Sequence, residues 1–233
     1  MTWKDQAVKH AEECMPQESC GLLAIIKGEK TYWPCKNIAE SGFEYFVIDP
    51  DDWAECEDTG EIIGVVHSHP NDPAIPSDND KASCDYLGFE WFIYSPMTKE
   101  WCNFKPTNFK SALYGRTWIW GKQDCLSLIW DYFEEKLNLK LKDWPRPKDL
   151  KSFAENPYFP KVLTESGFKK VDKNDIQPND ILVMEGIFNK LNHVALYIGD
   201  QTILHHTLKK LSCREIYDLQ YIKLTKEVYR YAA

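Results

Sequence analysis

Several features that would fix a protein's class at once are missing from this 233-residue sequence. No apolar run approaches the roughly 20 residues that a membrane-spanning helix requires, and residues 1–5 lack the apolar core of a signal peptide. None of the eight cysteines forms a Cys-x-x-Cys pair, so a structural zinc or iron–sulfur cluster is not indicated. We therefore expect no membrane span, a cytoplasmic location and reduced thiols.

Positive charge is in the minority. The sequence has 28 Lys and Arg residues against 36 Asp and Glu residues, which gives a formal net charge of −8. Proteins that bind nucleic acid neutralise phosphates with a basic surface, and no such excess is present here. We therefore expect no nucleic-acid partner.

The length fits two compact domains, each long enough to bury its own core. No internal repeat or low-complexity segment is evident. A polar stretch at 105–110 follows a strand-like run at 100–104, and we place the boundary there, with domains over residues 1–106 and 107–233. Both halves mix helical and strand periodicity, which predicts the α+β class.

The expected elements follow from hydrophobic periodicity and from turn residues. In the first half we expect helices over 3–14 and 78–87, a short helix entered at 49–50, and strands near 20–26, 31–34, 45–48, 61–66, 89–94 and 101–104. In the second half we expect helices over 125–139 and 160–166, and strands over 181–184, 193–198, 202–205 and 221–229.

Residues 67 to 80 carry a pattern typical of a metal site. Side chains two apart on a strand share a face, so His67 and His69 converge at the end of the strand expected from 61. Ser77 is a good helix N-cap, and Asp80 lies one turn further on the same side. Two nitrogen ligands and one oxygen ligand leave a fourth tetrahedral position open, which is typical of catalytic Zn²⁺.

A zinc-bound water needs a proton acceptor, and Glu18, which precedes an apolar strand, is the candidate general base. A glutamate followed far downstream by His-x-His, seven residues, Ser, two residues and Asp resembles the signature of the JAMM metallopeptidases, which cleave amide or isopeptide bonds. The resemblance implies that His67, His69 and Asp80 hold the metal, that Glu18 activates the water and that Ser77 helps to hold the oxyanion. Taken alone, the His-Ser-His triplet would more often be a packed pair of rings than a metal site.

The second half contains a candidate nucleophile, Cys125, at the start of a predicted helix and just after a capping Asp124. The free amide groups and the positive dipole end of such a helix favour the thiolate. His193 opens a predicted strand, and His205 lies on the next one after a short turn, so antiparallel pairing could bring one ring to accept the thiol proton and the other to orient it. The alternatives are a buried, inert cysteine and a core histidine.

This order of residues resembles the NlpC-type cysteine peptidases, which have a papain-like α+β core and cleave peptide bonds in the bacterial cell wall. The resemblance implies that Cys125, His193 and His205 are catalytic, and that Tyr114, eleven positions before the cysteine, lies near the nucleophile. Most members follow the cysteine with Ser-Gly. Here Leu126 follows it, so we expect a bulkier wall beside the nucleophile.

Three neighbouring side chains receive a structural interpretation. Trp118 and Trp120 alternate just before the cysteine and could line a substrate groove, but core packing is the favoured interpretation. His206 alternates to the opposite face from His205, and we leave it out of the site.

The two patterns in one chain, in this order, resemble the phage tail assembly protein K family. Further matching phrases lie at 123–125, 177–182, 192–199, 204–206 and 211–215. The resemblance implies a tail-assembly or tail-tip protein with two hydrolase sites, acting on peptidoglycan peptides and meeting other tail-tip proteins. It implies a location in the infected host cytoplasm during assembly, with the virion tail tip as a second location. Two alternatives stay open, namely a structural assembly factor with vestigial sites and a cytoplasmic protease that processes a tail protein.

Overall fold

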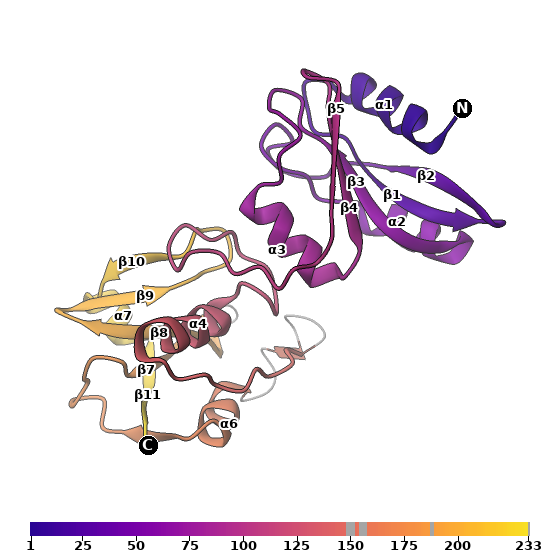
Figure 1. The fold of residues 1–233 in the computed structure, drawn as a ribbon. Helices are drawn as coiled ribbons and strands as arrows, with labels where there is room; N and C mark the ends of the chain where they lie inside the picture. The colour runs from indigo at the N-terminus through magenta and orange to yellow at the C-terminus, as the bar shows by residue number, and fades with distance from the viewer. Residues whose placement is uncertain (148–151, 154–157, 187–188, 233) are drawn as a thin grey trace. The chain divides into compact units, whose positions relative to one another are not determined.

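The computed structural model describes residues 1–147, 152–153, 158–186 and 189–232. The chain divides into two compact units, Met1–Phe109 and Lys110–Ala233 (Figure 1). The division falls at the end of the polar stretch at 105–110. Among the described residues, no helix has the length and apolar character needed to cross a membrane.

The first unit is a five-stranded sheet with helices on both faces. Its strand order is β2-β1-β3-β4-β5. Only β3 and β4 run parallel, and α3 connects them, whereas the other neighbours in this sheet are antiparallel. The elements are α1 (Trp3–Cys14), β1 (Cys20–Ile26), β2 (Glu29–Cys35), α2 (Pro50–Thr59), β3 (Glu61–Ser68), α3 (Asp78–Leu87), β4 (Glu90–Ser95) and β5 (Glu100–Phe104).

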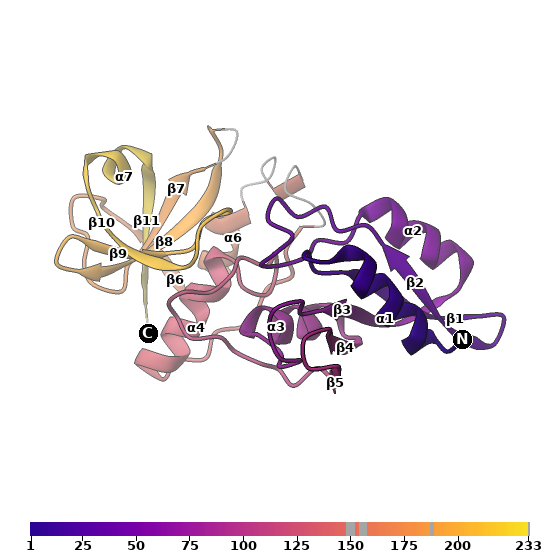
Figure 2. The same ribbon diagram turned by 90° about the horizontal axis from the view of Figure 1, so that it is seen from above.

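Strand alternation sends the side chains of β1 to two separate cores. Leu22 and Ala24 pack with Cys56 of α2 on one face, and Leu23 packs with Ala7 of α1 on the other. Figure 2 shows α1 and α2 on either side of this sheet. Because β1 and β3 are covered on both faces, most of their residues are apolar. Their antiparallel pairing places Cys20 opposite His67 at the carboxyl end of β3.

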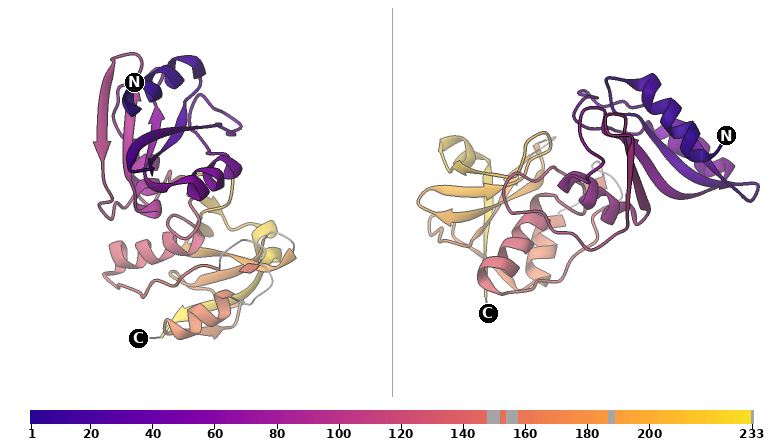
Figure 3. Two further views of the ribbon diagram at one scale, coloured as in Figure 1. Left: turned by 90° about the vertical axis from the view of Figure 1, so that its right-hand side faces the viewer. Right: turned by 45° about the horizontal axis from the view of Figure 1, so that its top comes forward.

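The second unit contains a six-stranded sheet in which every neighbouring pair is antiparallel, in the order β10-β9-β8-β7-β11-β6. Figure 3 shows this unit from two further sides, in pink to yellow. Its elements are α4 (Cys125–Leu137), α6 (Tyr158–Glu165), β6 (Phe168–Val171), β7 (Ile181–Glu185), β8 (Leu191–Gly199), β9 (Thr202–His205), β10 (Cys213–Ile216), α7 (Leu219–Leu224) and β11 (Thr225–Tyr231).

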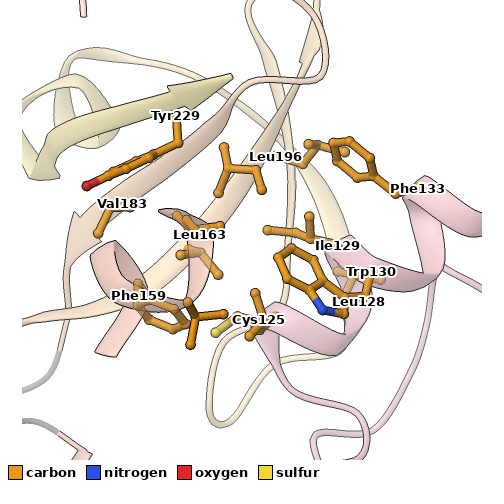
Figure 4. Packing of buried hydrophobic residues seen from close by; sticks show 14 of the residues in the cluster. Cys125, Leu128, Ile129, Trp130, Phe133, Phe159, Leu163, Val183, Leu196 and Tyr229 are labelled. Atoms are coloured by element: carbon orange, nitrogen blue, oxygen red, sulfur yellow. The ribbon is translucent and has the colours of Figure 1, made fainter. Parts of the chain in front are cut away.

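Helix α4 packs its apolar stripe on this sheet. Leu128, Ile129 and Phe133 recur at helical spacing and are almost completely buried against side chains such as Leu196 of β8 (Figure 4). Cys125 belongs to the same cluster. The packing therefore fixes the start of the helix against β8, where the predicted catalytic side chains lie.

The α+β class is confirmed, and five elements differ from expectation. The expected strand at 45–48 does not form; this segment makes one bridge, between Ile48 and Asn37, and its alternate side chains Tyr45 and Val47 are exposed. The strand expected from 221 starts at Thr225 instead, because Asp218 caps the short helix α7 before it. Strands β6 and β10 were not expected; both are four-residue edge strands that contain charged residues and no apolar run.

Candidate functional site

The two histidines of the first unit converge at the carboxyl end of β3. His67 Nε2 lies 3.2 Å from His69 Nε2. The Asp80 carboxylate reaches both rings from the first turn of α3, with Oδ1 3.3 Å from His67 Nε2 and Oδ2 3.5 Å from His69 Nε2. His67 and Asp80 are 1% and 5% exposed. The spacing that the sequence predicted for these three residues is therefore present.

These distances suit a tetrahedral metal ion. Zinc holds nitrogen and oxygen ligands at about 2.0–2.2 Å, which puts the ligand atoms roughly 3.3–3.6 Å from one another. The three separations of 3.2, 3.3 and 3.5 Å are close to that range. The residues thus fit a Zn²⁺ ion with three protein ligands and one open position.

Neighbouring groups orient two of the three ligands. A carbonyl oxygen can only accept, so His69 Nδ1 donates to Pro73 O at 3.1 Å, and in the neutral ring Nε2 then keeps the lone pair that a metal needs. Asp80 Oδ2 accepts from Ser77 N at 2.8 Å and from Ser77 Oγ at 2.7 Å. Burial raises the pKa of Asp80, but the facing His67 and His69 rings and the Ser77 hydroxyl outweigh it and hold the pKa well below its usual range.

Glu18 lies beside this cluster because β1 and β3 are paired. Cys20 is opposite His67 in the register, and Ser19 N donates to Ser68 Oγ at 2.9 Å, which ties the residue after Glu18 to the end of β3. The Glu18 side chain is buried, and burial raises its pKa to about 7, while the charge of His69 acts in the opposite direction. A carboxyl group with a pKa near neutrality is well matched to general base catalysis.

In the second unit, Cys125 is the first residue of α4. Asp124 caps the helix, and its Oδ1 accepts from the backbone N–H groups of Leu126 at 3.1 Å and Ser127 at 2.9 Å. The backbone N–H groups of Leu126 and Val194 act on the Cys125 thiol and lower its pKa. Val194 is the residue after His193.

Cys125 and His193 line one narrow cavity of about 120 Å³. His193 Nε2 lies 3.2 Å from His205 Nδ1, and His205 is 1% exposed. Ala195 is opposite His205 in the β8–β9 register, so His193 and His205 are diagonal neighbours across the two strands. The structure therefore brings the thiol and the two imidazoles to one place.

Burial determines the resting protonation of this pair. It raises the pKa of the Cys125 thiol, an effect that the Asp124 charge increases and that the Val194 and Leu126 amides oppose. Burial also lowers the pKa of His193, and the nearby His205 lowers it further. Without substrate, the site consequently holds a neutral thiol beside a neutral imidazole.

Two sequence expectations do not agree with the geometry of this cavity. Tyr114 does not line it; the side chain is 40% exposed and accepts a hydrogen bond from Arg214 Nε at 2.9 Å. Leu126 does not narrow it, because this side chain is fully buried in the core cluster. The bulky wall expected beside the nucleophile is therefore wrong.

Residues that received a structural interpretation line the cavity instead. Trp118 and Trp120 form part of its wall, stacked with ring centroids 5.7 Å apart. His206 also lines it, because β9 ends at His205 and strand alternation does not extend to the next residue. The alternating spacing of the two tryptophans could have predicted that they line the cavity, whereas nothing in the local sequence pattern predicted this for His206.

Two charged residues that support the trio were missed. Glu215 of β10 lies behind His205, with Oε2 3.4 Å from His205 Nε2. Arg146 makes a buried ion pair with Asp124. Both come from segments distant in sequence from Cys125. Glu215 lies in the segment 211–215, which resembles the family, but no sequence pattern indicated a role for Arg146.

Comparisons with known proteins divide the chain at the same region. Residues 2–111 match the family of prokaryotic homologs of the JAB domain, and residues 115–230 match the NlpC/P60 family.

Three curated proteins are similar to this chain. The tail tip assembly protein K of Escherichia phage N15 is 30% identical over 229 residues, which cover 97% of this chain and 93% of that protein. The protein of the same name from Escherichia phage lambda is 29% identical over 188 residues, 80% of this chain and 90% of that protein. The desampylase of Haloferax volcanii is 29% identical over 105 residues, 40% of this chain and 76% of that protein. The chain thus belongs to the phage tail tip assembly protein K family, with a JAB-type domain followed by an NlpC/P60 domain.

Proposed function

We propose that this tail assembly protein has two hydrolase sites. The site in the second unit is a cysteine peptidase with Cys125, His193 and His205, and it cleaves stem peptides of peptidoglycan. The site in the first unit is a zinc metallo-isopeptidase-like centre. The observation that supports the proposal best is that Cys125 and His193 line the same cavity, with His205 3.2 Å behind the His193 ring.

The peptidase reaction follows from this geometry. The thiol proton of Cys125 passes to His193, and the sulfur attacks the carbonyl carbon of the scissile amide. His193 then gives the proton to the leaving amine, which leaves an acyl group on the sulfur. Water, deprotonated by His193, hydrolyses this thioester and restores the thiol. His205 holds the His193 ring in position throughout.

The cavity and the family both favour a peptide substrate. Its walls are mostly apolar and include Trp118 and Trp120, which can pack on a peptide while the imidazoles meet the amide. Stem peptides are the substrates that the resemblance to NlpC-type peptidases implies. Partners among the other tail-tip proteins follow from the assembly role, with action in the host cytoplasm during assembly or at the virion tail tip.

In the first unit, His67, His69 and Asp80 would hold the zinc ion. A bound Zn²⁺ supplies a water molecule of lowered pKa and a Lewis acid for a carbonyl oxygen. Glu18, buried and with a pKa near 7, can take up and release a proton at neutral pH. The Ser77 hydroxyl donates to Asp80, so Ser77 holds this carboxylate in place and must release it to help hold an oxyanion.

Product analysis by mass spectrometry tests the function. The purified chain is incubated with peptidoglycan and, separately, with uncleaved tail proteins. Release of soluble stem-peptide fragments supports the proposal, whereas processing of a tail protein alone supports the alternative of a cytoplasmic protease. Normal tail assembly by a phage that carries Cys125→Ala, His67→Ala and His69→Ala together, with no cleavage by the wild-type protein, would favour a structural assembly factor.

A further inference from the structure

We infer that Glu215 is a positioning residue that fixes the hydrogen positions on His205 and His193. The inference rests on the proposed peptidase function of the second unit. Glu215 touches neither the proposed nucleophile nor the cavity. It contacts the outer edge of the His205 ring.

The sheet aligns the three side chains. In the β9–β10 register Cys213 is opposite His205, so Glu215, two residues further, is its diagonal neighbour. His193 has the same diagonal relation to His205 on the other side. Three adjacent strands thus carry His193, His205 and Glu215 in a row, with separations of 3.2 Å and 3.4 Å between the facing atoms.

The Glu215 carboxylate is kept ionised. Lys210 Nζ donates to its Oε1, and the Tyr221 hydroxyl donates to its Oε2. Cys213 Sγ lies 3.8 Å from Oε1. Burial raises the pKa of Glu215, but the hydrogen bonds from Lys210 and Tyr221 and the facing His205 outweigh it and lower the pKa to about 2.

An ionised carboxylate can only accept hydrogen bonds, and this determines the hydrogens along the row. His205 presents Nε2 to Glu215, so this nitrogen carries the hydrogen and Nδ1 keeps a lone pair. That lone pair faces His193 Nε2, which must then carry a hydrogen. His193 Nδ1 is left as the acceptor for the Cys125 proton. When His193 becomes positive, Glu215 supplies a balancing charge, as the third member of a catalytic triad does.

A bound cation is the competing explanation for the same group. His205, Cys213 and Glu215 offer ligand atoms that lie within 4.8 Å of one another. The Lys210 ammonium already donates to the carboxylate, so the negative charge has its counter-ion within the chain. The row of facing atoms that runs from Glu215 through His205 to His193, with separations of 3.4 Å and 3.2 Å, favours the positioning role.

The test uses the full chain and two measurements that need no substrate. The ring ¹⁵N chemical shifts of His193 and His205 report which nitrogen of each ring carries hydrogen. The rate at which iodoacetamide alkylates Cys125 reports the thiolate fraction. This rate is measured at several pH values from the mass of the peptide that contains Cys125.

Glu227→Gln is a matched control for Glu215→Gln. Glu227 also has a lysine and a tyrosine as partners, with Lys170 Nζ 2.6 Å from Oε1 and the Tyr229 hydroxyl 2.9 Å from Oε2. The two glutamates are 20% and 21% exposed, and they differ in that Glu215 also faces the ring of His205.

In the wild-type protein we expect the hydrogen on Nε2 of both rings. In Glu215→Gln we expect a mixture of tautomers and roughly tenfold slower alkylation at neutral pH, because loss of an opposite charge nearby shifts a pKa by about 1 unit or more. Glu215→Asp should restore most of the rate, and Glu227→Gln should match the wild type. A wild-type His205 with its hydrogen on Nδ1, or unchanged alkylation in Glu215→Gln, would overturn the inference.

The wild-type ring shifts decide the question even where a variant does not fold. They also separate this inference from the proposed function. Peptidoglycan that stays uncleaved by the wild-type chain would reject the function, whereas the tautomers of His193 and His205 would still report whether Glu215 sets them.

Discussion

Arg146 and Asp124 form a buried, bidentate ion pair at the start of α4. Arg146 Nε lies 2.7 Å from Asp124 Oδ2, and its Nη2 lies 3.0 Å from Oδ1. The side chains are 3% and 1% exposed. Because the same carboxylate caps the helix that begins with Cys125, the pair ties Cys125 to a distant segment of the chain.

Replacing Arg146 by Met should destabilise the second unit by about 3–5 kcal/mol, since the substitution leaves the Asp124 charge buried and unpaired. Urea denaturation measures the change. Asp143→Asn is the control, because Asp143 contacts the same guanidinium from a side chain that is 75% exposed. An Arg146→Met protein as stable as the wild type would contradict the role given to this pair.

Glu18 gives the first unit a distinct dependence on pH. Its pKa rises from 4.5 to about 7 on folding, so the folded state holds this proton more tightly than the unfolded state. The stabilisation is fully present below pH 4.5 and is lost as the pH rises through 7. In the metal-free protein, a rise from about pH 5 to about pH 8 should lower the free energy of unfolding of the wild type by about 2–3 kcal/mol more than that of Glu18→Gln.

Zinc provides the control for that measurement. A nearby cation favours the carboxylate, so zinc loading should lower the pKa of Glu18 and shrink the difference between the two proteins. Equal pH dependence in the wild type and Glu18→Gln, measured by urea unfolding without metal, would show that Glu18 is not in the environment described.

Substitution of two aspartates in the first turn of α3, Asp80 and Asp78, tests the proposed zinc site. We expect the wild type to bind about one Zn²⁺ per chain, and Asp80→Asn to bind at least about 100-fold more weakly. Asp78→Asn should bind like the wild type, because Asp78 is exposed and contacts Lys81 instead. Titration calorimetry gives both affinities, and tight binding by Asp80→Asn would rule out this ligand set.

Trp118 should contribute to substrate binding. Trp118→Leu removes an aromatic wall of the cavity. The loss of about 1 kcal/mol of substrate-binding free energy should raise KM roughly fivefold, with little change in kcat. Tyr114→Phe should leave both constants unchanged, because this side chain contacts Arg214 outside the cavity. A large fall in kcat for Tyr114→Phe would instead support the catalytic place that the family resemblance gave to this tyrosine.

Local rules were sufficient for much of both candidate sites. Strand alternation predicted that His67 and His69 converge, and helix capping predicted that Asp80 returns toward them from α3. The start of α4 at Cys125 follows from the Asp124 cap in the same way. These features depend on residues within a few positions of one another, where sequence spacing determines geometry.

The remaining features depend on pairing between distant segments. Arg146 reaches Asp124 across 22 positions in sequence, through a proline-containing loop without periodicity. Glu215 meets His205 only through the β9–β10 register, and β10 is a short edge strand without an apolar run. Strand alternation misplaced His206, because the strand ends one residue earlier.

If Cys125 is the nucleophile of a wall peptidase, as proposed, Cys125→Ala must lose the ability to digest peptidoglycan. With soluble stem-peptide fragments counted by mass spectrometry, we expect the rate to fall by at least about 10³-fold, since removal of a nucleophile abolishes its covalent step. Cys102→Ala, which removes a partly buried thiol from the other unit, should digest like the wild type. Undiminished digestion by Cys125→Ala would contradict the account.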